Sequence, residues 1–513
     1  MSIVKISDVS KGVNFDTMPE ELADGVWSSC QNMRFRNGFA QRFRGLTDVF
    51  NTPTVTPHFI APFQTISKRF WAYAGTEKVF VDDGTTKTEI TPASLFTGAV
   101  DDRWSGGTLS GILVLNNGVD KPTYWNGDTG TDLATLPGWG ATWKSAVVKP
   151  FKEYLIALDV TKGSSRYPHM VKWSHSAAPG AIPTSWDETD VTKDAGEQDL
   201  AQTPDLLVDA LPMGDVMIVY KERSMYSMSF IGQPYIWRFQ KLPGDSGMLT
   251  RGCAVNTPLG HVVLTAGDVI LHQGQGVTSI ADGSIRSYIF NNIDSQNYKR
   301  AFVTANPQRN EVLICFPLNG GTGYCDKAAV WNWVDKTWGL RDLSGVTYGA
   351  FGQADIPNTP TTWDGDSGTW DTDVSEWNEN EYAPNEARLL LTRSSPSIVA
   401  FDTGSTDFGV NFRGVLERTQ MAFGDSYAIK FVRAVYPKVD SGSGAVLQVE
   451  VGYSMSADES PQWTNAVTYT VGTDNKVDVM AKGRYISLRI TSTGAAPWRI
   501  RSIDMDIQMA GAY

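Results

Sequence analysis

The sequence predicts an all-β protein: a β-propeller of about six to eight blades, with an N-terminal arm and hairpin and a C-terminal β-sandwich of jelly-roll type. Three observations support this. Only 19% of the residues are charged, while glycines and aromatic residues, which suit turns and strands, are abundant. Short strand pairs recur through the middle of the chain, and the last hundred residues hold six strand-like runs. The expected domains are residues 1–50, 51–414 and 415–513.

The N-terminal segment contains a compact basic and aromatic hairpin. Asn37-Gly38 is a strong hairpin signal, because both central residues of a type I′ turn need positive φ. The flanking sequences Arg34-Phe35-Arg36 and Arg42-Phe43-Arg44 alternate, which predicts arginines on one face and phenylalanines on the other. We therefore expect an exposed basic face that docks on another protein, since arginine favours interfaces. An ordinary edge hairpin, or contact of the arginines with DNA, is the alternative.

The middle of the chain repeats a strand, a tight turn, a second strand and a glycine-rich loop. Seven such pairs can be marked by a central strand residue: Ala72, Leu113, Leu155, Ile218, Val263, Leu313 and Leu390. Four of the six steps between these residues are near the ~40–50 residues of common propeller blades. One longer step contains the loop Ala177–Pro204, and the other contains an acidic insert. Two stacked β-sandwiches are the structural alternative.

The acidic insert, residues 353–386, accounts for most of the net charge of −12, because it carries nine carboxylates and no Lys or Arg. Trp363, Trp370 and Trp377 recur in it at seven-residue spacing, each followed by Asp or Asn. Self-repulsion of the carboxylates predicts a projecting loop whose indoles stack on one another or on a neighbouring protein. A calcium site is the less favoured reading, since the EF-hand spacing and its terminal Glu are missing.

The C-terminal hundred residues are rich in β-branched and aromatic residues and predict a β-sandwich. The expected strands are Ile429–Tyr436, Val446–Tyr453, Ala466–Val471, Lys476–Met480, Tyr485–Thr491 and Trp498–Ile507.

Motifs for catalysis, metals or cofactors are not evident in the sequence. Cys30, Cys253, Cys315 and Cys325 show no zinc spacing, and Cys315 lies in an apolar run that predicts a buried thiol. Five histidines complete no ligand set, and His261 and His272, which flank a predicted hairpin, are expected to be structural. Asp101-Asp102 is one candidate carboxylate pair for glycoside hydrolysis, although such pairs also occur in turns. We expect no enzyme activity, cofactor, signal peptide or membrane span.

The stretch Gly12–Gly45, which runs from Gly-Val-Asn through Pro-Glu-Glu-Leu to Asn-Met-Arg-Phe-Arg-Asn-Gly, resembles the N-terminal region of tail hub or nozzle proteins of short-tailed bacteriophages (podoviruses), also called packaged-DNA stabilisation proteins. The hairpin VWNWVDKTWGLRD and the closing GRYISLRI…WRIRSIDMDI extend the similarity along the chain.

The resemblance implies a structural virion protein, made in the host cytoplasm and located in the tail. Such proteins form a homo-hexamer below the portal and its adaptor (head-to-tail connector) ring, and contact tail fibres, tailspikes or a tail needle. Genome DNA passes through the lumen without sequence-specific binding, which an acidic protein suits because it repels phosphate. The interface residues expected on this basis are Arg34, Arg36, Arg42, Arg44, Trp363, Trp370 and Trp377. The alternative is a carbohydrate-binding or glycan-cleaving propeller at the tail tip, with these tryptophans stacked on sugar rings.

Overall fold

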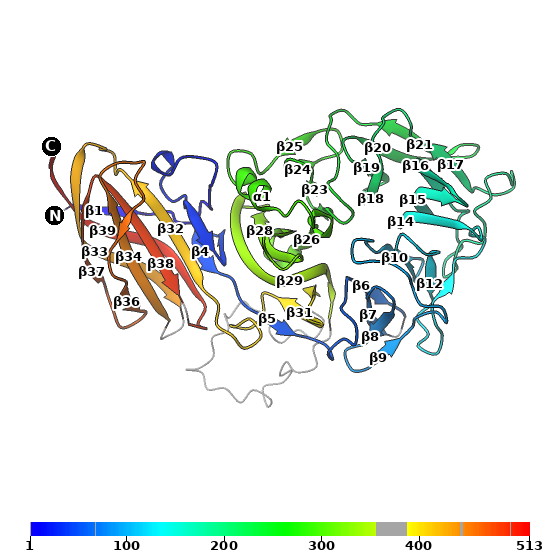
Figure 1. The fold of residues 1–513 in the computed structure, drawn as a ribbon, viewed down its shortest axis with the longest axis horizontal. Helices are drawn as coiled ribbons and strands as arrows, with labels where there is room; N and C mark the ends of the chain where they lie inside the picture. Colours follow the sequence, from blue (N-terminus) through cyan, green and yellow to red (C-terminus); the bar gives the residue numbers. More distant parts are fainter. Residues whose placement is uncertain (1, 67, 355–386, 442–444, 493, 513) are drawn as a thin grey trace.

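The computed structural model describes residues 2–66, 68–354, 387–441, 445–492 and 494–512. Its fold is all-β, with a β-propeller at one end and a two-sheet sandwich at the other (Figure 1). Both chain termini lie at the outer end of the sandwich, away from the propeller (Figure 1). The chain therefore starts in the sandwich, crosses into the propeller, completes its ring and returns.

In the described residues, the propeller has seven blades of four antiparallel strands. Five blades are separate sheets. They are β6 (Phe59–Gln64), β7 (Arg69–Ala74), β8 (Val79–Asp82), β9 (Lys87–Glu89); β10 (Ser105–Leu109), β11 (Ile112–Asn116), β12 (Thr123–Trp125), β13 (Ala134–Thr135); β14 (Trp143–Phe151), β15 (Tyr154–Lys162), β16 (Ser165–Trp173), β17 (Gly196–Asp199); β18 (Leu207–Met213), β19 (Val216–Lys221), β20 (Met225–Gly232), β21 (Ile236–Lys241); and β22 (Ala254–Thr257), β23 (Gly260–Leu264), β24 (Val269–His272), β25 (Val277–Ser279).

The sixth and seventh blades share one long strand, β29 (Thr337–Gln353). Its first part pairs with β28 (Cys325–Asn332) and completes the sixth blade, which also holds β26 (Phe302–Asn306) and β27 (Glu311–Pro317). Its second part is the first strand of the seventh blade and pairs with β30 (Ala387–Arg393), followed by β31 (Ser397–Phe401). The fourth strand of this blade, β5 (Leu46–Asp48), comes from the N-terminal segment. The ring is thus closed by strands from both ends of the propeller sequence.

Side chains also tie neighbouring blades together. The Trp104 indole donates to the Gly75 carbonyl at 2.9 Å, and Asn116 donates to the Ser145 carbonyl at 3.0 Å. Across the closing interface, the Trp71 indole donates to the Gln353 carbonyl at 2.8 Å. Because buried polar groups are costly unless paired, these bonds fix the position of each blade relative to the next.

The sandwich is built from both ends of the chain. Its strands are β1 (Ser2–Ile6), β2 (Ser29–Gln31), β32 (Gly414–Met421), β33 (Ala428–Ser441), β34 (Val446–Ser454), β35 (Gln462–Trp463), β36 (Val467–Thr470), β37 (Val477–Gly483), β38 (Tyr485–Ser492) and β39 (Trp498–Ala512). One sheet contains β1, β39, β33 and β37, and the other contains β2, β32, β38, β34, β35 and β36. Apolar side chains between the sheets, such as Leu447, Leu488 and Ile503, are fully buried.

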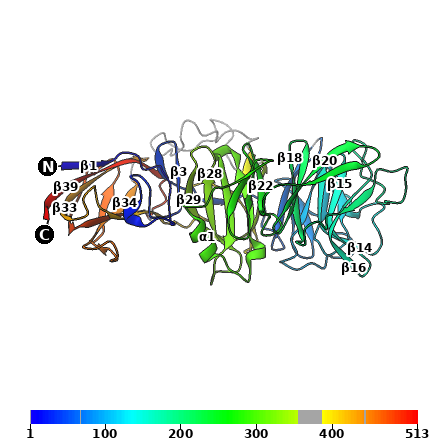
Figure 2. The ribbon, with the colours of Figure 1, turned by 90° about the horizontal axis from the view of Figure 1, so that it is seen from above.

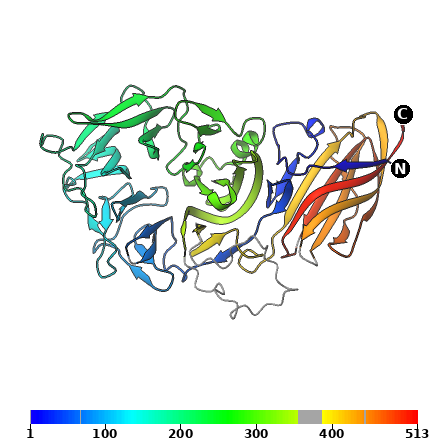
Figure 3. The same cartoon turned by 180° about the vertical axis from the view of Figure 1, so that it is seen from behind.

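The hairpin of β3 (Met33–Arg36) and β4 (Phe39–Arg42) joins the two units. Met33 pairs with Leu340 of propeller strand β29, and Gln41 pairs with Arg499 of sandwich strand β39. One sheet therefore runs without a break in hydrogen bonding from the sixth blade through the hairpin into the sandwich. Figures 2 and 3 show the hairpin strands between the green blade and the red and orange sandwich strands.

Much of this architecture agrees with the sequence-based expectations. The seven marker residues, from Ala72 to Leu390, all lie in the second strand of their blades. The six expected C-terminal strands are present as β33, β34, β36, β37, β38 and β39. The N-terminal arm differs from the expectation, because β1 and β2 pair with β39 and β32 inside the sandwich and β5 belongs to the propeller. Residues 1–50 thus contribute to every part of the fold.

Helices contribute little to the described residues. They are the 3-10 turns η1 (Pro19–Glu21), η2 (Tyr298–Arg300) and η3 (Pro307–Arg309) and the short helix α1 (Arg286–Asn292). In the portion of the chain that the structure describes, no helix has the length and apolar character needed to cross a membrane.

The ring closure gives a first testable prediction. The Val49 N–H donates to the Ile398 carbonyl at 3.0 Å, directly after β5, and the Val49 side chain is buried. Val49→Pro removes this donor and leaves a buried carbonyl unpaired, which costs roughly 1–3 kcal/mol in the free energy of unfolding. Val49→Ala keeps the N–H and serves as the control for lost packing. We expect the proline variant to unfold at lower denaturant concentration than the alanine variant; equal midpoints would contradict this role of the closure.

Candidate functional site: the joint between propeller and sandwich

The hairpin β3–β4 forms as the sequence predicts. Asn37 and Gly38 both have positive φ, 52° and 80°, as a type I′ turn requires. The strands pair Arg34 with Gln41 and Phe35 with Ala40. The neighbouring strand β29 approaches so closely that a Cβ on Gly339 would lie 2.3 Å from the Met33 carbonyl oxygen. The absence of a side chain at position 339 is therefore what allows the hairpin to lie against the propeller.

Arg34 is buried in a cluster of charges that joins the hairpin to two blades. Its side chain is 3% exposed, and its guanidinium pairs with Asp402, just after β31, and with Glu311 of β27 at 3.5 Å. Arg309 also contacts Asp402, at 3.3 Å, and the Arg44 N–H donates to the same carboxylate at 2.9 Å. The guanidinium of Arg34 lies over the Phe43 ring, 4.1 Å from its centroid. The charge is thus compensated by groups far away in the sequence.

The two carboxylates beside Arg34 have different electrostatic states. Burial alone would raise the pKa of Asp402, but Arg34 and Arg309 outweigh it and hold that pKa below its usual range. For Glu311, burial dominates over the attraction of Arg34 and raises the pKa. One oxygen of Glu311, Oε2, is buried and has no hydrogen-bond partner. Arg34 therefore serves chiefly as the counter-ion of Asp402.

Arg42 is buried in a second cluster, on the sandwich side of the hairpin. It is 1% exposed and donates to the carbonyls of Ala495 at 2.9 Å and Phe412 at 3.1 Å. The Phe412 ring contacts two guanidinium groups, those of Arg42 at 3.8 Å and Arg341 at 4.2 Å from its centroid. Arg341 in turn pairs with Asp407 at 2.5 Å. Residues 402–413, which leave the propeller for the sandwich, are held between these arginines.

A third contact, around Asn32, is not indicated by any sequence motif. Asn32 is buried with φ of 56°, accepts the Asp342 N–H at 2.8 Å and donates to the Arg413 carbonyl at 2.7 Å. The Asp342 carboxylate pairs with Lys327 and accepts from Gln31. One side chain therefore bonds both the propeller strand β29 and the segment that leads into the sandwich.

The structure corrects the expected exposure of the arginines. We expected Arg34, Arg36, Arg42 and Arg44 on an exposed face, but Arg34 and Arg42 are buried and Arg36 and Arg44 are partly buried. The alternation is present, yet both faces of the hairpin are covered, because it lies between two domains. A substitution of Arg34 or Arg42 by Glu would place a carboxylate in the joint. The other expected interface residues, Trp363, Trp370 and Trp377, lie outside the described residues, as do the carboxylates of the considered calcium site.

The remaining chemical candidates have structural partners. Asp101 pairs with Arg300 at 2.8 Å, and Asp102 accepts the Ala99 N–H at 2.9 Å. His175 accepts the Asp194 N–H at 3.1 Å. All four cysteines are buried and none is joined in a disulfide; burial was expected for Cys315. Within the described ranges, His, Cys, Asp and Glu do not gather in threes in a way that would hold a metal ion.

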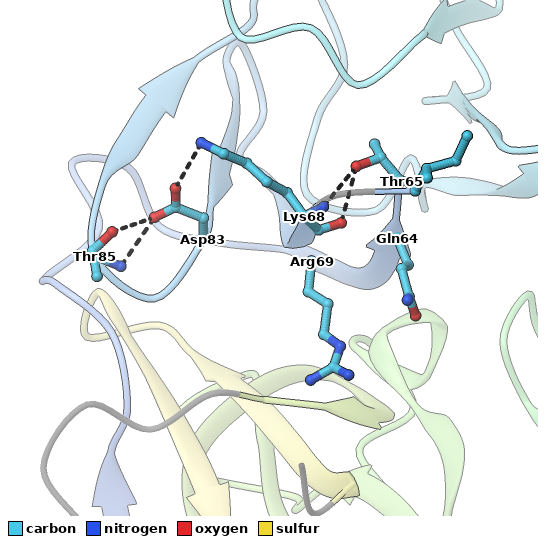
Figure 4. A pocket seen from close by; sticks show the side chains of 7 residues that line it. Gln64, Thr65, Lys68, Arg69, Asp83 and Thr85 are labelled. Carbon is cyan, nitrogen blue, oxygen red and sulfur yellow. Dashed lines mark hydrogen bonds and ion pairs between the residues drawn. The ribbon is translucent and has the colours of Figure 1, made fainter. Parts of the chain in front are cut away.

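An open polar pocket lies on the first blade, between the turns that follow β6 and β8 (Figure 4). Lys68 and Asp83 face each other across it at 3.7 Å. Burial opposes ionisation of Asp83, but the hydrogen bonds from Thr86 and Thr85 together with the attraction of Lys68 outweigh it and lower the pKa. The carboxylate is thus fixed as the acceptor of its own turn. The other lining residues are Gln64, Thr65, Ile66, Arg69 and Thr85.

Comparisons with known proteins name no family for this chain. No family model and no curated protein matches the chain. Among solved structures, it is similar to the WD40 β-propeller domain of Doa1 (9% identity, TM-score 0.37, covering 70% of this chain and 97% of that one). BBS1N in complex with ARL6DN (11%, 0.37, 70% and 96%) and YCF48 bound to D1 peptide (9%, 0.37, 72% and 96%) are also similar. The fold assignment rests on the strand pairing described above.

The unequal carboxylates at Arg34 give a second prediction. Asp402→Asn removes the buried counter-ion of Arg34 and should lower the free energy of unfolding by about 3–5 kcal/mol. Glu311→Gln is nearly isosteric and removes a charge that burial already disfavours, so its effect should stay within about 1 kcal/mol. Denaturant unfolding of both variants at pH 7 tests this. Equal losses in the two variants would show that Arg34 depends on both carboxylates alike.

Proposed function

We propose that this chain is a structural virion protein, the subunit of a hexameric tail hub or nozzle of a short-tailed bacteriophage. In this proposal it lies below the portal and its adaptor ring, lines the route of genome ejection and helps retain packaged DNA. The observation that carries the proposal is that the stretch resembling the family, Gly12–Gly45, is also the stretch that builds the joint of the fold.

The contacts of the Gly12–Gly45 stretch indicate whether its resemblance to the family concerns the architecture or a docking surface. Gly12 lies against β29, since its φ is 85° and a Cβ would contact the Trp338 backbone at 3.0 Å. The Trp27 N–H donates to the Gly12 carbonyl at 2.9 Å, and the Trp27 indole donates to the Val9 carbonyl at 2.8 Å. The motif residues are thus committed to packing within the chain. A resemblance in such residues supports a shared architecture rather than a shared docking surface.

The mechanical character of the molecule suits a wall subunit. Two β-domains are joined by a continuous sheet and by buried charge clusters, so bending between them would break hydrogen bonds in a desolvated environment. A subunit that surrounds a pressurised genome has to keep its shape under load. The net charge of −12 is compatible with a conduit that does not retain DNA by direct binding.

Assembly is the experiment that tests the proposed function. We expect the purified protein to be monomeric or weakly associated and to form its ring on the virion, because the family that it resembles does so and the sequence has no long coiled-coil heptad repeat. On virions, particle images should show a six-fold ring at the position of this protein. A three-fold or twelve-fold ring there would overturn the proposal, and specific binding of purified protein to a glycan array would favour the carbohydrate-binding alternative.

The acidic insert gives a further prediction, on assembly. It connects β29 to β30, and its flanking residues Gln353 and Ala387 are paired across the two strands. Because these ends lie side by side, deletion of residues 362–382 with a short Gly-Ser linker should leave the melting temperature within a few degrees of wild type. It should reduce the incorporation of a tail component into particles.

A variant with Trp363, Trp370 and Trp377 replaced by Ala keeps the length and charge of the insert and serves as the matched control. If indole contacts cause the defect, this variant should reproduce it. Loss of folding on deletion would mean that the insert belongs to the propeller core. If the deletion variant gives particles with the normal tail components, the insert has no role in assembly.

A further inference from the structure

Three buried ionisable side chains meet between the fourth and fifth blades. His261 of β23 and His272 of β24 are register partners in the fifth blade, and Tyr220 of β19 reaches them from the fourth. All three are at most 1% exposed. The Tyr220 hydroxyl lies 2.9 Å from Nδ1 of His261 and 3.1 Å from Nδ1 of His272. Nε2 of His261 lies 2.9 Å from the Pro212 carbonyl of β18.

Counting protons gives a hydrogen-bond pattern that satisfies both contacts of the Tyr220 hydroxyl in the neutral cluster. The Pro212 carbonyl can only accept, so Nε2 of His261 carries the hydrogen of that ring. Nδ1 of His261 is then a lone-pair acceptor and takes the single hydrogen of the Tyr220 hydroxyl. The hydroxyl oxygen in turn accepts from Nδ1–H of His272. The bonds of the Tyr220 hydroxyl to the two imidazoles thus link the fourth blade to the fifth without a buried charge.

A proton on either imidazole would place a positive charge in this apolar interior, which is costly because the charge is removed from water. Burial lowers the pKa of His261 to about 4, against the bond to Pro212, and His272 lowers it further. Burial also lowers the pKa of His272, although the Gly274 carbonyl partly offsets this. The two imidazoles therefore bind protons more weakly in the closed interface between the blades than they would in an opened one.

Charged groups on the packed elements do not compensate such a proton. Asp209 of β18 pairs with Lys149 at 3.4 Å, and Lys221 of β19 pairs with Asp205 at 3.5 Å. Asp268, at the turn between β23 and β24, accepts from the Val269 N–H and the Ser279 hydroxyl.

We propose that the Tyr220–His261–His272 cluster is an acid-sensitive lock that holds the fourth and fifth blades together at neutral pH and releases them on acidification. The direction of the pH dependence follows from the linkage between proton binding and opening of the interface. The contribution of His261 is complete above the unfolded histidine pKa of about 6.5 and declines as the pH falls from there toward its folded pKa of about 4, and the contribution of His272 changes in the same direction. If both imidazoles take up a proton on opening, the opening equilibrium rises by up to about 100-fold for each pH unit in this window.

Hydrogen exchange of the full chain at pH 7.5 and pH 5.0, with times corrected for the intrinsic pH dependence, tests the lock. Peptides covering β19, β23 and β24 should lose protection at pH 5.0, while peptides of the second blade keep theirs. The double variant His261→Gln/His272→Gln retains polar groups that do not titrate, and should abolish the acid response. His58→Gln, a control at a partly buried histidine of the first blade whose pKa burial lowers to about 4, should leave the response in place.

Two results would overturn the lock. One is wild-type protection of β23 and β24 at pH 5.0 equal to that at pH 7.5. The other is an acid response that survives in the double Gln variant. If the double variant fails to fold, the single variant His272→Gln tests the proposal. Only one imidazole can then take up a proton, so the opening equilibrium should rise by at most about 10-fold for each pH unit. Tyr220→Phe should lower protection at both pH values while keeping the acid response.

Discussion

The rest of the structure depends on how the hairpin β3–β4 is held between propeller and sandwich. Its backbone continues the sheet in both directions, and its two inner arginines are buried against groups from distant parts of the chain. Burying a guanidinium is costly unless its charge and donors are matched. Arg34 is matched by carboxylates, whereas Arg42 is matched by backbone carbonyls and an aromatic ring. This difference keeps each strand of the hairpin in a single register.

The ring of blades depends on the same region. The seventh blade is complete only when β5 pairs with β31, and β5 follows the hairpin after three residues. Asp402 directly follows β31 and binds Arg34, so the last strand pair of the ring and the joint share one carboxylate. Closure of the propeller and attachment of the sandwich are therefore coupled. A defect at Asp402 affects both, which distinguishes it from a defect in any interior blade.

The sequence predicted the blades well because their signal is local. Each second strand is a short apolar run next to a tight turn, so Leu113 or Val263 can be placed from its neighbours alone. The joint could not be predicted in this way. Alternation in β3 and β4 separates arginines from phenylalanines, but it does not tell whether one face or both are covered. That depends on Glu311 and Asp402, which lie hundreds of residues away and have no distinctive sequence context. The bond network of Asn32 is hidden for the same reason.

The order of motifs in the first fifty residues follows from this topology. Between Ser2 and Asp48 the chain must pair with the sandwich, pass the propeller strand β29, form the joint and supply the closing strand. Each step has a narrow requirement: a close backbone approach at Gly12, a positive-φ turn at Asn37-Gly38, and a buried arginine on each side of that turn, Arg34 and Arg42. Blade strands need only be apolar and of suitable length, so many sequences serve. A short stretch that meets several narrow requirements in a fixed order is therefore more distinctive in sequence than the strands of the blades.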